Sequence, residues 1–445
     1  MPSPPARSSL NRDILRLAVP ALGALVAEPL FLIVDSALVG HLGTVPLAAL
    51  GIASAILQTI VGLMVFLAYS TTPAVARRFG AGDARSAVSV GIDGLWLALG
   101  IGALLALAGV LATPWMVGVF GASEQVAADA ITYLQISMWG LPAMLIVFAA
   151  TGLLRGMQDT VTPLWIAVAG FAANAGLNGL LIYGLGWGIA GSAAGTVLAQ
   201  WGMVIAYVLV IGRLARRHAA PVGPSRDGVR SSALTGGWML LRTVSLRIAL
   251  LATVAVATGL GTEELAGWQV AFTLFSTAAF ALDALAIAAQ ALIGKALGEG
   301  DEHLVRRVLQ RTTAWGLWFG IVVGMAIGAA SGVLGLLFTG EPEIAALLQP
   351  ALIVLAIAQP VCGVVFVWDG VLIGAGDARY LAIAGALNLV PFVPALIIVA
   401  IVHPAGAAGL AWLAVAFFGV YMLARLGTLG WRVRGGAWLT AGATA

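Results

Sequence analysis

The chain has 445 residues, of which 61% are hydrophobic and only 9% are charged, and its mean hydropathy is +1.03. A water-soluble fold needs more polar surface than this composition supplies, so a soluble enzyme or binding domain is excluded. The formal net charge is +3, and the single cysteine, Cys362, permits no disulfide within the chain.

Twelve apolar stretches are long enough to cross a bilayer as helices, because about 20 residues rising 1.5 Å each cover a hydrocarbon core of roughly 30 Å. The sequence therefore predicts an all-α integral membrane protein with twelve transmembrane helices. In chain order the predicted spans lie near 14–40, 47–74, 87–111, 128–153, 162–184, 189–212, 235–258, 266–293, 309–337, 345–373, 380–402 and 405–425.

The sequence also repeats itself at a fixed offset of 218 positions. The loop tripeptide LGT at 42–44 returns at 260–262, and the window 141–159 matches 359–377 at 7 of 19 positions. Each copy contains six predicted spans, an even number, so both copies enter the membrane from the same side. The sequence thus predicts two six-helix bundles related by a parallel pseudo-two-fold repeat, an arrangement typical of transporters.

Composition shifts divide the chain into an N-lobe at 1–212, a cytoplasmic linker rich in Pro, Gly and charge at 213–234, and a C-lobe at 235–445 that ends in a short cytoplasmic tail. Placing the N-terminus in the cytoplasm assigns 20 of the 22 Lys and Arg residues, Arg425 among them, to the cytoplasmic side. We therefore expect both termini to be cytoplasmic. This asymmetry accounts for the basic balance, which gives no indication of nucleic-acid binding.

Ionisable groups inside the spans of the first half are the best indication of function, because each costs roughly 2.5–3.5 kcal/mol at mid-membrane. Glu28 and Asp35 lie seven residues apart on one face of the first span, and Asn174 and Asn178 form an i, i+4 pair at matching depth on the fifth. Such a cluster suits a carboxyl that takes up a proton, Na⁺ or a cationic substrate and then releases it. The alternative is that these groups only hold neighbouring helices together.

The second half carries both charge signs inside its spans. Arg247 and Asp283 are predicted at similar depths, as are Arg242 and Asp369 nearer the cytoplasm. Because paired charges are the cheaper arrangement in a membrane, the favoured interpretation is structural ion pairing. Gating or substrate contact is the alternative.

Catalytic motifs are absent from the sequence. The four histidines lie in separate loops, and the sequence has no HExxH or CxxC spacing and no glycine-rich phosphate loop after a strand. We therefore expect no enzyme activity, no metal site and no cofactor. A membrane-embedded enzyme would need a catalytic constellation that the sequence does not display.

Three stretches resemble one transporter family. They are LAVPALGALVAEPLFLIVDSALVGHLG at 17–43, ALDALAIAAQALIGKALGEGD at 281–301 and FVWDGVLIGAGD at 366–377. Together they are similar to the multidrug and toxic compound extrusion (MATE) transporters, in particular their bacterial DinF-like branch. The resemblance covers nearly the whole chain.

The resemblance implies secondary active efflux of cationic or amphipathic small molecules in exchange for H⁺ or Na⁺, by alternating access of two bundles around a central cleft. Asp35 matches the family's essential first-helix carboxylate, Pro20 the proline at which that helix bends, and Asn174 an asparagine of the same pocket. Asn178 stands where some archaeal relatives have a second acid, which leaves Glu28 as the candidate second carboxyl. A single principal acid favours H⁺ over Na⁺.

We also expect a monomer in the bacterial inner membrane, surrounded by lipid and without a nucleic-acid partner. Two other transport functions remain open. A flippase for lipid-linked precursors belongs to the same superfamily, but it would need several basic residues in its cleft, where only Arg242 and Arg247 are available. A channel fits two linked repeats less well than alternating access does.

Overall fold

The computed structural model describes residues 7–335 and 342–442, and within these ranges the chain forms helices and no strands. Eleven segments are single helices, or helices in direct succession, that are long and apolar enough to cross a membrane. The twelfth span consists of α5 (Glu124–Met138) and α6 (Leu141–Gly156), which are bent by 46° at the break between them. The prediction of a twelve-span, all-α membrane protein is confirmed.

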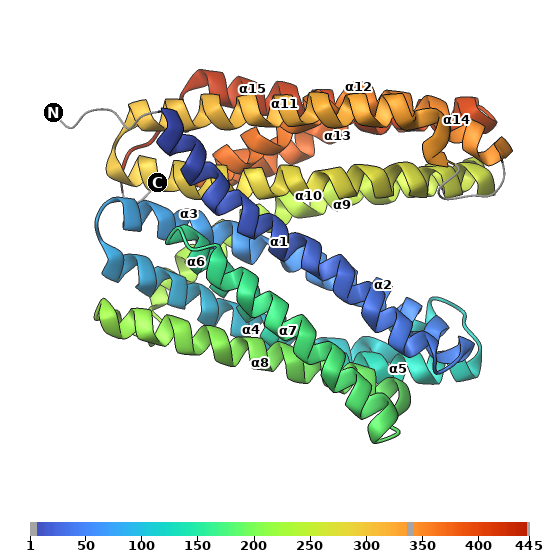
Figure 1. Cartoon of the computed structure of the whole chain (residues 1–445), viewed down its shortest axis with the longest axis horizontal. Helices are drawn as coiled ribbons and strands as arrows, with labels where there is room; N and C mark the ends of the chain where they lie inside the picture. Colours follow the sequence, from blue (N-terminus) through green and yellow to red (C-terminus); the bar gives the residue numbers. More distant parts are fainter. Residues whose placement is uncertain (1–6, 336–341, 443–445) are drawn as a thin grey trace. The chain divides into compact units, whose positions relative to one another are not determined.

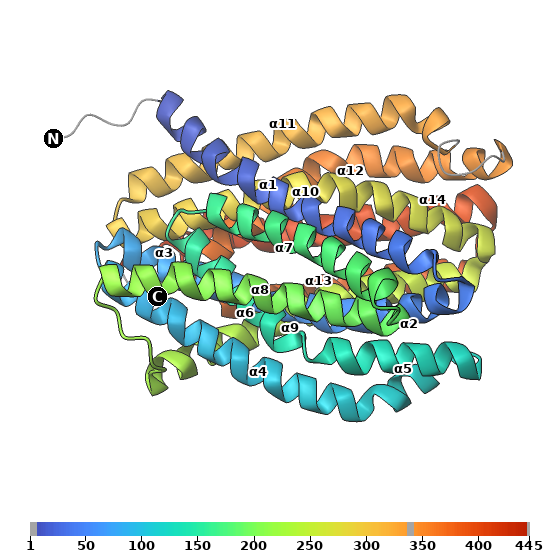
Figure 2. The same ribbon diagram turned by 60° about the horizontal axis from the view of Figure 1, so that its bottom comes forward.

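Most of the first half of the chain forms one compact unit, residues 19–236, called the first unit below. In this unit α7 and α8 run side by side, and α4 packs against α5 and α6 (Figures 1 and 2). Besides α5 and α6, its elements are α1 (Arg7–Gly40), α2 (Thr44–Met64), α3 (Phe66–Gly80), α4 (Ala84–Gly118), α7 (Val161–Gly179), the π-helix η1 (Leu180–Gly184) and α8 (Gly188–Arg217).

The second half forms another compact unit, called the second unit below, whose described residues are 237–335 and 342–442 together with 7–18. Its most extensive contacts run between α11 and α12 and between α10 and α12 (Figure 1). Its elements are α9 (Arg226–Leu260), α10 (Thr262–Glu299), α11 (Glu302–Leu334), α12 (Pro342–Gly374), α13 (Ala378–Val402), α14 (Gly406–Ala414), the π-helix η3 (Val415–Tyr421) and α15 (Met422–Gly435).

The division between the units crosses two helices at positions where the sequence weakens them. It crosses α1 between Ala18 and Val19, one residue before Pro20, which lacks the N–H of a regular helix turn. It crosses α9 between Gly236 and Gly237, a pair that lowers helix propensity. The first unit therefore spans 19–236, whereas the sequence predicts the N-lobe at 1–212.

The connection between the halves is shorter than the predicted linker at 213–234. Helix α8 continues to Arg217 and α9 begins at Arg226, so only 218–225 lies outside helices. This connection is fixed to α4, because Asp93 accepts hydrogen bonds from the backbone N–H and the hydroxyl of Ser225, at 2.7 and 2.9 Å. The predicted linker was too long because charged, Pro and Gly residues were interpreted as loop. In the structure, the last turn of α8 and the first turns of α9 are polar and extend beyond the apolar stretches of these helices.

Helix packing repeats at the sequence offset of 218. A Cβ atom on Gly152 would lie 2.9 Å from the carbonyl oxygen of Ala68, and one on Gly370 would lie 2.5 Å from the carbonyl oxygen of Ala286. Both pairs are related by 218 positions, so α6 crosses α3 as the end of α12 crosses the end of α10. Close backbone approach, which only glycine permits, thus explains why these glycines recur in both halves.

Loop residues repeat in the same way. Asp83 accepts a hydrogen bond from the backbone N–H of Ser86, and Asp301 accepts one from Leu304, so each caps the helix that follows it. The hydrogen bonds from Ser86 lower the pKa of the Asp83 carboxyl. The preceding glycines, Gly82 and Gly300, have φ of 82° and 73° and end the earlier helix in the left-handed region.

Candidate functional site

A buried carboxylate in the first unit is the centre of the candidate site. Asp35 on α1 is only 5% exposed. Its Oδ1 atom accepts hydrogen bonds from Nδ2 of Asn178 at 2.7 Å and from the hydroxyl of Ser192 at 2.9 Å, and both donors are fully buried. Three helices, α1, α7 and α8, therefore meet at one carboxylate oxygen.

The other oxygen of this carboxylate is free. Oδ2 of Asp35 accepts no hydrogen bond from the part of the chain that the structure describes. The Oδ1 atoms of Asn174 and Asn178 are buried and likewise have no hydrogen-bond partner among the described residues. The site thus offers three oxygen acceptors, an arrangement suited to a proton or to a positively charged group.

The fold positions these groups through a glycine on α8. A Cβ atom on Gly195 would overlap Oδ1 of Asn178 and would lie 3.1 Å from the Asn178 backbone nitrogen. Only glycine at this position lets Asn178 fit between α8 and Asp35. The chain then forms the π-helix η1 directly after α7, a local irregularity common next to functional sites.

A second layer of hydroxyl groups extends the site. Asn174 donates to the hydroxyl of Thr196 at 2.9 Å, and the Tyr133 hydroxyl lies among the hydroxyls of Ser137, Ser192 and Thr196. Sequence reasoning missed Tyr133, Ser192 and Thr196. Ser192 and Thr196 carried a usable signal, since they are an i, i+4 polar pair in the otherwise apolar α8.

Two of the predicted residues lie outside this network. The structure places Glu28 on α1 as an exposed residue that forms no hydrogen bond or ion pair with the described residues. Pro20 lies inside α1, as does Pro29, and the helix continues through both. Glu28 and Asp35 lie on the same face of α1, but they are seven residues apart. Their Cα atoms are therefore about 10 Å apart along the helix axis, too far for their side chains to share one site.

Helix α1 is held to α7 and η1 by few side chains. Phe31 stacks on Phe171 with ring centroids 5.1 Å apart, and the Tyr183 hydroxyl donates to the carbonyl oxygen of Leu38 at 2.5 Å. Only 11% of the most apolar window of this span is buried, the smallest share among the eleven continuous spans found in the described residues. Sparse packing is typical of elements that move.

The repeat shows that the second unit has no copy of this site within its described residues. Thr253, which corresponds to Asp35, is buried and donates to the carbonyl oxygen of Ala249 at 2.7 Å, within its own helix. The positions of Asn178 and Ser192 are taken by the buried residues Leu396 and Leu410. The polar chemistry is therefore specific to the first unit.

The second unit instead contains a buried charge cluster. Arg242 on α9 forms an ion pair and hydrogen bonds with Asp369 on α12. Arg425 on α15 lies 3.6 Å from the same carboxylate and 5.8 Å from the Phe366 ring. Arg425 is buried inside this unit. The distribution of basic residues, which placed it on the cytoplasmic side, did not reveal its partner on α12.

The other predicted pair does not form. Arg247 and Asp283 are both half-buried, and no ion pair joins them in the described structure. Similar depth in the membrane is a necessary condition for pairing, but the two helices must also turn these faces toward each other.

Comparison with known proteins identifies the family. The sequence model of the MatE family matches residues 20–180 and 240–399. The chain belongs to the MATE family. Its two matched segments correspond to the two halves of the repeat.

Individual relatives agree with this assignment. The chain is 30% identical to Protein DETOXIFICATION 44, chloroplastic, of Arabidopsis thaliana, over 98% of this chain and 84% of the relative. It is 27% identical to DNA damage-inducible protein F of Escherichia coli, over 83% and 82%. A solved structure of the Vibrio cholerae MATE transporter VcmN in the bent form has the same fold, with a TM-score of 0.87, 22% identity and coverage of 97% and 99%.

MATE proteins are multidrug and toxic compound efflux transporters and are not enzymes. The chain is accordingly a multi-pass membrane transporter of small molecules. Family membership confirms the resemblance found in the sequence, including its DinF-like relatives.

Proposed function

We propose that this MATE transporter exports cationic or amphipathic small molecules in exchange for protons, and that Asp35 binds the proton. The arrangement of the Asp35 carboxylate is the observation that carries this proposal. One of its oxygens is fixed by Asn178 and Ser192, and the other is free to accept a proton. Both termini are cytoplasmic in this proposal, as the distribution of basic residues predicts.

Protonation changes the strength of the contacts that hold α1. A hydrogen bond to a charged group contributes about 1.5–3 kcal/mol, whereas one between neutral groups contributes about 0.5–1.5 kcal/mol. Adding a proton to Oδ2 converts both bonds at Oδ1 from the first kind to the second. A loss of about 1 kcal/mol at each bond sums to about 2 kcal/mol, or a roughly 30-fold shift between two conformations of α1.

Helix α1 is suited to respond to that shift. It is sparsely packed, and Pro20 interrupts its hydrogen bonding where the chain passes from one unit to the other. Releasing Asp35 from Asn178 and Ser192 lets the segment after Pro20 repack. This repacking expels substrate, and deprotonation restores the earlier state.

The free acceptor oxygens support a cationic substrate. The buried Oδ1 atoms of Asn174 and Asn178 have no hydrogen-bond partner within the described ranges. A substrate ammonium group carries the donors that they lack, and it reaches them when α1 repacks and opens the site. A proton and a cationic substrate that compete for the Asp35 carboxylate cannot both be bound at the same time. Binding of one therefore releases the other, which couples proton uptake to substrate export.

Efflux of a fluorescent organic cation from proteoliposomes tests the proposal. A pH gradient should drive efflux by the wild-type protein, and the isosteric Asp35→Asn variant should fold normally but abolish it. Glu28→Gln removes an equivalent acid that lies outside the network, and we expect it to retain transport. Normal efflux by Asp35→Asn would refute the role of Asp35, and efflux driven by a Na⁺ gradient alone would refute proton coupling.

A further inference from the structure

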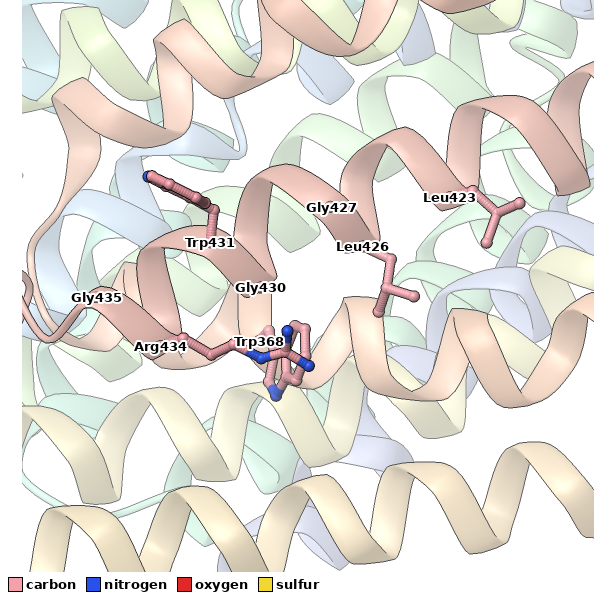
Figure 3. Close-up of a pocket in the computed structure, with 8 residues that line it drawn as sticks. All are labelled: Trp368, Leu423, Leu426, Gly427, Gly430, Trp431, Arg434 and Gly435. Atoms are coloured by element: carbon pink, nitrogen blue, oxygen red, sulfur yellow. The ribbon is translucent and has the colours of Figure 1, made fainter.

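A groove on the second unit is lined by none of the charged residues of the Arg242–Asp369–Arg425 cluster. It runs along α15 and is bounded by Trp368 of α12, and it encloses about 610 Å³ (Figure 3). This volume is within the range of roughly 300–1,000 Å³ that is typical of ligand sites.

Missing side chains on α15 create the groove. A Cβ atom on Gly427 would meet nothing within 4 Å, and one on Gly430 would lie 2.9 Å from Cζ3 of Trp368. Gly430 therefore lets the indole ring lie directly against α15. Nε1 of Trp368 donates to the hydroxyl of Thr313 on α11 at 3.1 Å, so the ring is fixed in place.

The groove is apolar at one end and cationic at the other. Leu423 and Leu426 line the end nearer the middle of the span, and Trp431 and Arg434 line the end where α15 stops (Figure 3). Eleven residues separate Leu423 from Arg434, about 16 Å along a helix. That length matches one leaflet, which is half of a hydrocarbon core of roughly 30 Å.

The charge at the cationic end is available to a ligand. Arg434 is exposed and forms no ion pair within the described part of the chain, and no acidic residue lines the groove. The neighbouring Arg432 is already neutralised by Asp377, at 2.5 and 3.2 Å. Trp431, also exposed, is of the kind that lies at headgroup level in membrane proteins.

We propose that this groove binds an anionic phospholipid. One acyl chain lies along Leu423, Gly427 and Trp368, and the phosphate contacts the guanidinium of Arg434, which lies beside the Trp368 ring (Figure 3). A zwitterionic lipid fits less well, because the groove has no acidic group for its cationic moiety. Basic pockets between transmembrane helices recognise anionic headgroups in this way.

Native mass spectrometry of the delipidated full-length protein tests the proposal, with phosphatidylglycerol and phosphatidylcholine of the same acyl chains as probes. We expect phosphatidylglycerol to bind about fivefold more tightly, the usual effect of one interfacial arginine. Arg434→Gln should remove this preference. Gly427→Leu should fill the groove and weaken binding of both lipids.

Arg311→Gln is the matched control. Arg311 lines a second Trp-bearing pocket on α11, but its guanidinium donates to Asn11 at 2.6 Å. We expect this variant to bind both lipids as the wild type does. Equal binding of the two lipids by the wild type, an equal effect of Arg311→Gln and Arg434→Gln, or no effect of Gly427→Leu would each overturn the proposal. Dye efflux and thermal unfolding of every variant confirm that it is folded.

Discussion

Replacing Gly195 by alanine should disturb the Asp35 site from a position that does not touch the carboxylate. The added Cβ atom would overlap Oδ1 of Asn178 and approach the Asn178 backbone nitrogen to 3.1 Å. The Asn178 side chain must then move away, and its 2.7 Å hydrogen bond to Asp35 is lost.

The size of the effect follows from those contacts. Overpacking a tight site costs about 1–3 kcal/mol, and a hydrogen bond to a charged group contributes about 1.5–3 kcal/mol. Asn178→Ala also loses the bond, but it creates the space that the methyl group of Gly195→Ala needs. The double variant should therefore be no less stable than Asn178→Ala alone. The coupling energy then equals the whole cost of Gly195→Ala, about 2.5–6 kcal/mol when the two contributions add.

Thermal unfolding of the four proteins of this double-mutant cycle in detergent, together with dye efflux in proteoliposomes, measures the coupling. Gly202→Ala is the control on the same helix, because its Cβ atom would meet nothing within 4 Å. It should raise stability by roughly 0.5–1 kcal/mol through helix propensity. Strictly additive losses at positions 178 and 195 would show that Gly195 does not act through Asn178, and the reasoning would fail.

Two further predictions concern stability. Asp369→Asn leaves the buried guanidinium groups of Arg242 and Arg425 without their shared carboxylate and should cost about 3–5 kcal/mol. Arg425→Gln keeps the closer pair and should cost clearly less, as thermal unfolding will show. Gly370→Ala should cost about 1–3 kcal/mol, because its Cβ atom would lie 2.5 Å from a backbone oxygen; Gly152→Ala, its copy in the repeat, should have a similar effect.

Each of these predictions has an outcome that contradicts it. If Arg425→Gln destabilises the protein as much as Asp369→Asn, the surplus arginine is essential to the cluster and the proposed ranking is wrong. For the glycines, Gly328→Ala is the control, since its Cβ atom would make an ordinary 3.5 Å contact with Ala356. Equal stability of Gly328→Ala and Gly370→Ala would disprove the close helix crossing.

The sequence alone determined the membrane spans and the duplicated architecture. Unpaired polar groups are costly inside a bilayer, so each membrane-spanning helix needs a long run of apolar residues. Such runs can be found from the sequence alone. The repeat was legible because glycines at helix crossings, such as Gly152 and Gly370, cannot change without a backbone clash. Asp35 could be selected for a related reason: an acid deep in a span is costly and is retained for a purpose.

Only the tertiary structure decided which groups meet. The hydrogen-bond partners of Asp35 lie 143 and 157 residues away in the sequence. Helical periodicity predicts the depth of a residue and the face of the helix on which it lies, but not how the neighbouring helices are rotated about their own axes. For that reason Asn178 was predicted and Ser192 was missed, Glu28 was grouped with a carboxyl it does not contact, and the contact of Arg425 with Asp369 was not foreseen. Depth is a property of one helix, whereas a site requires several helices to turn the right faces toward each other.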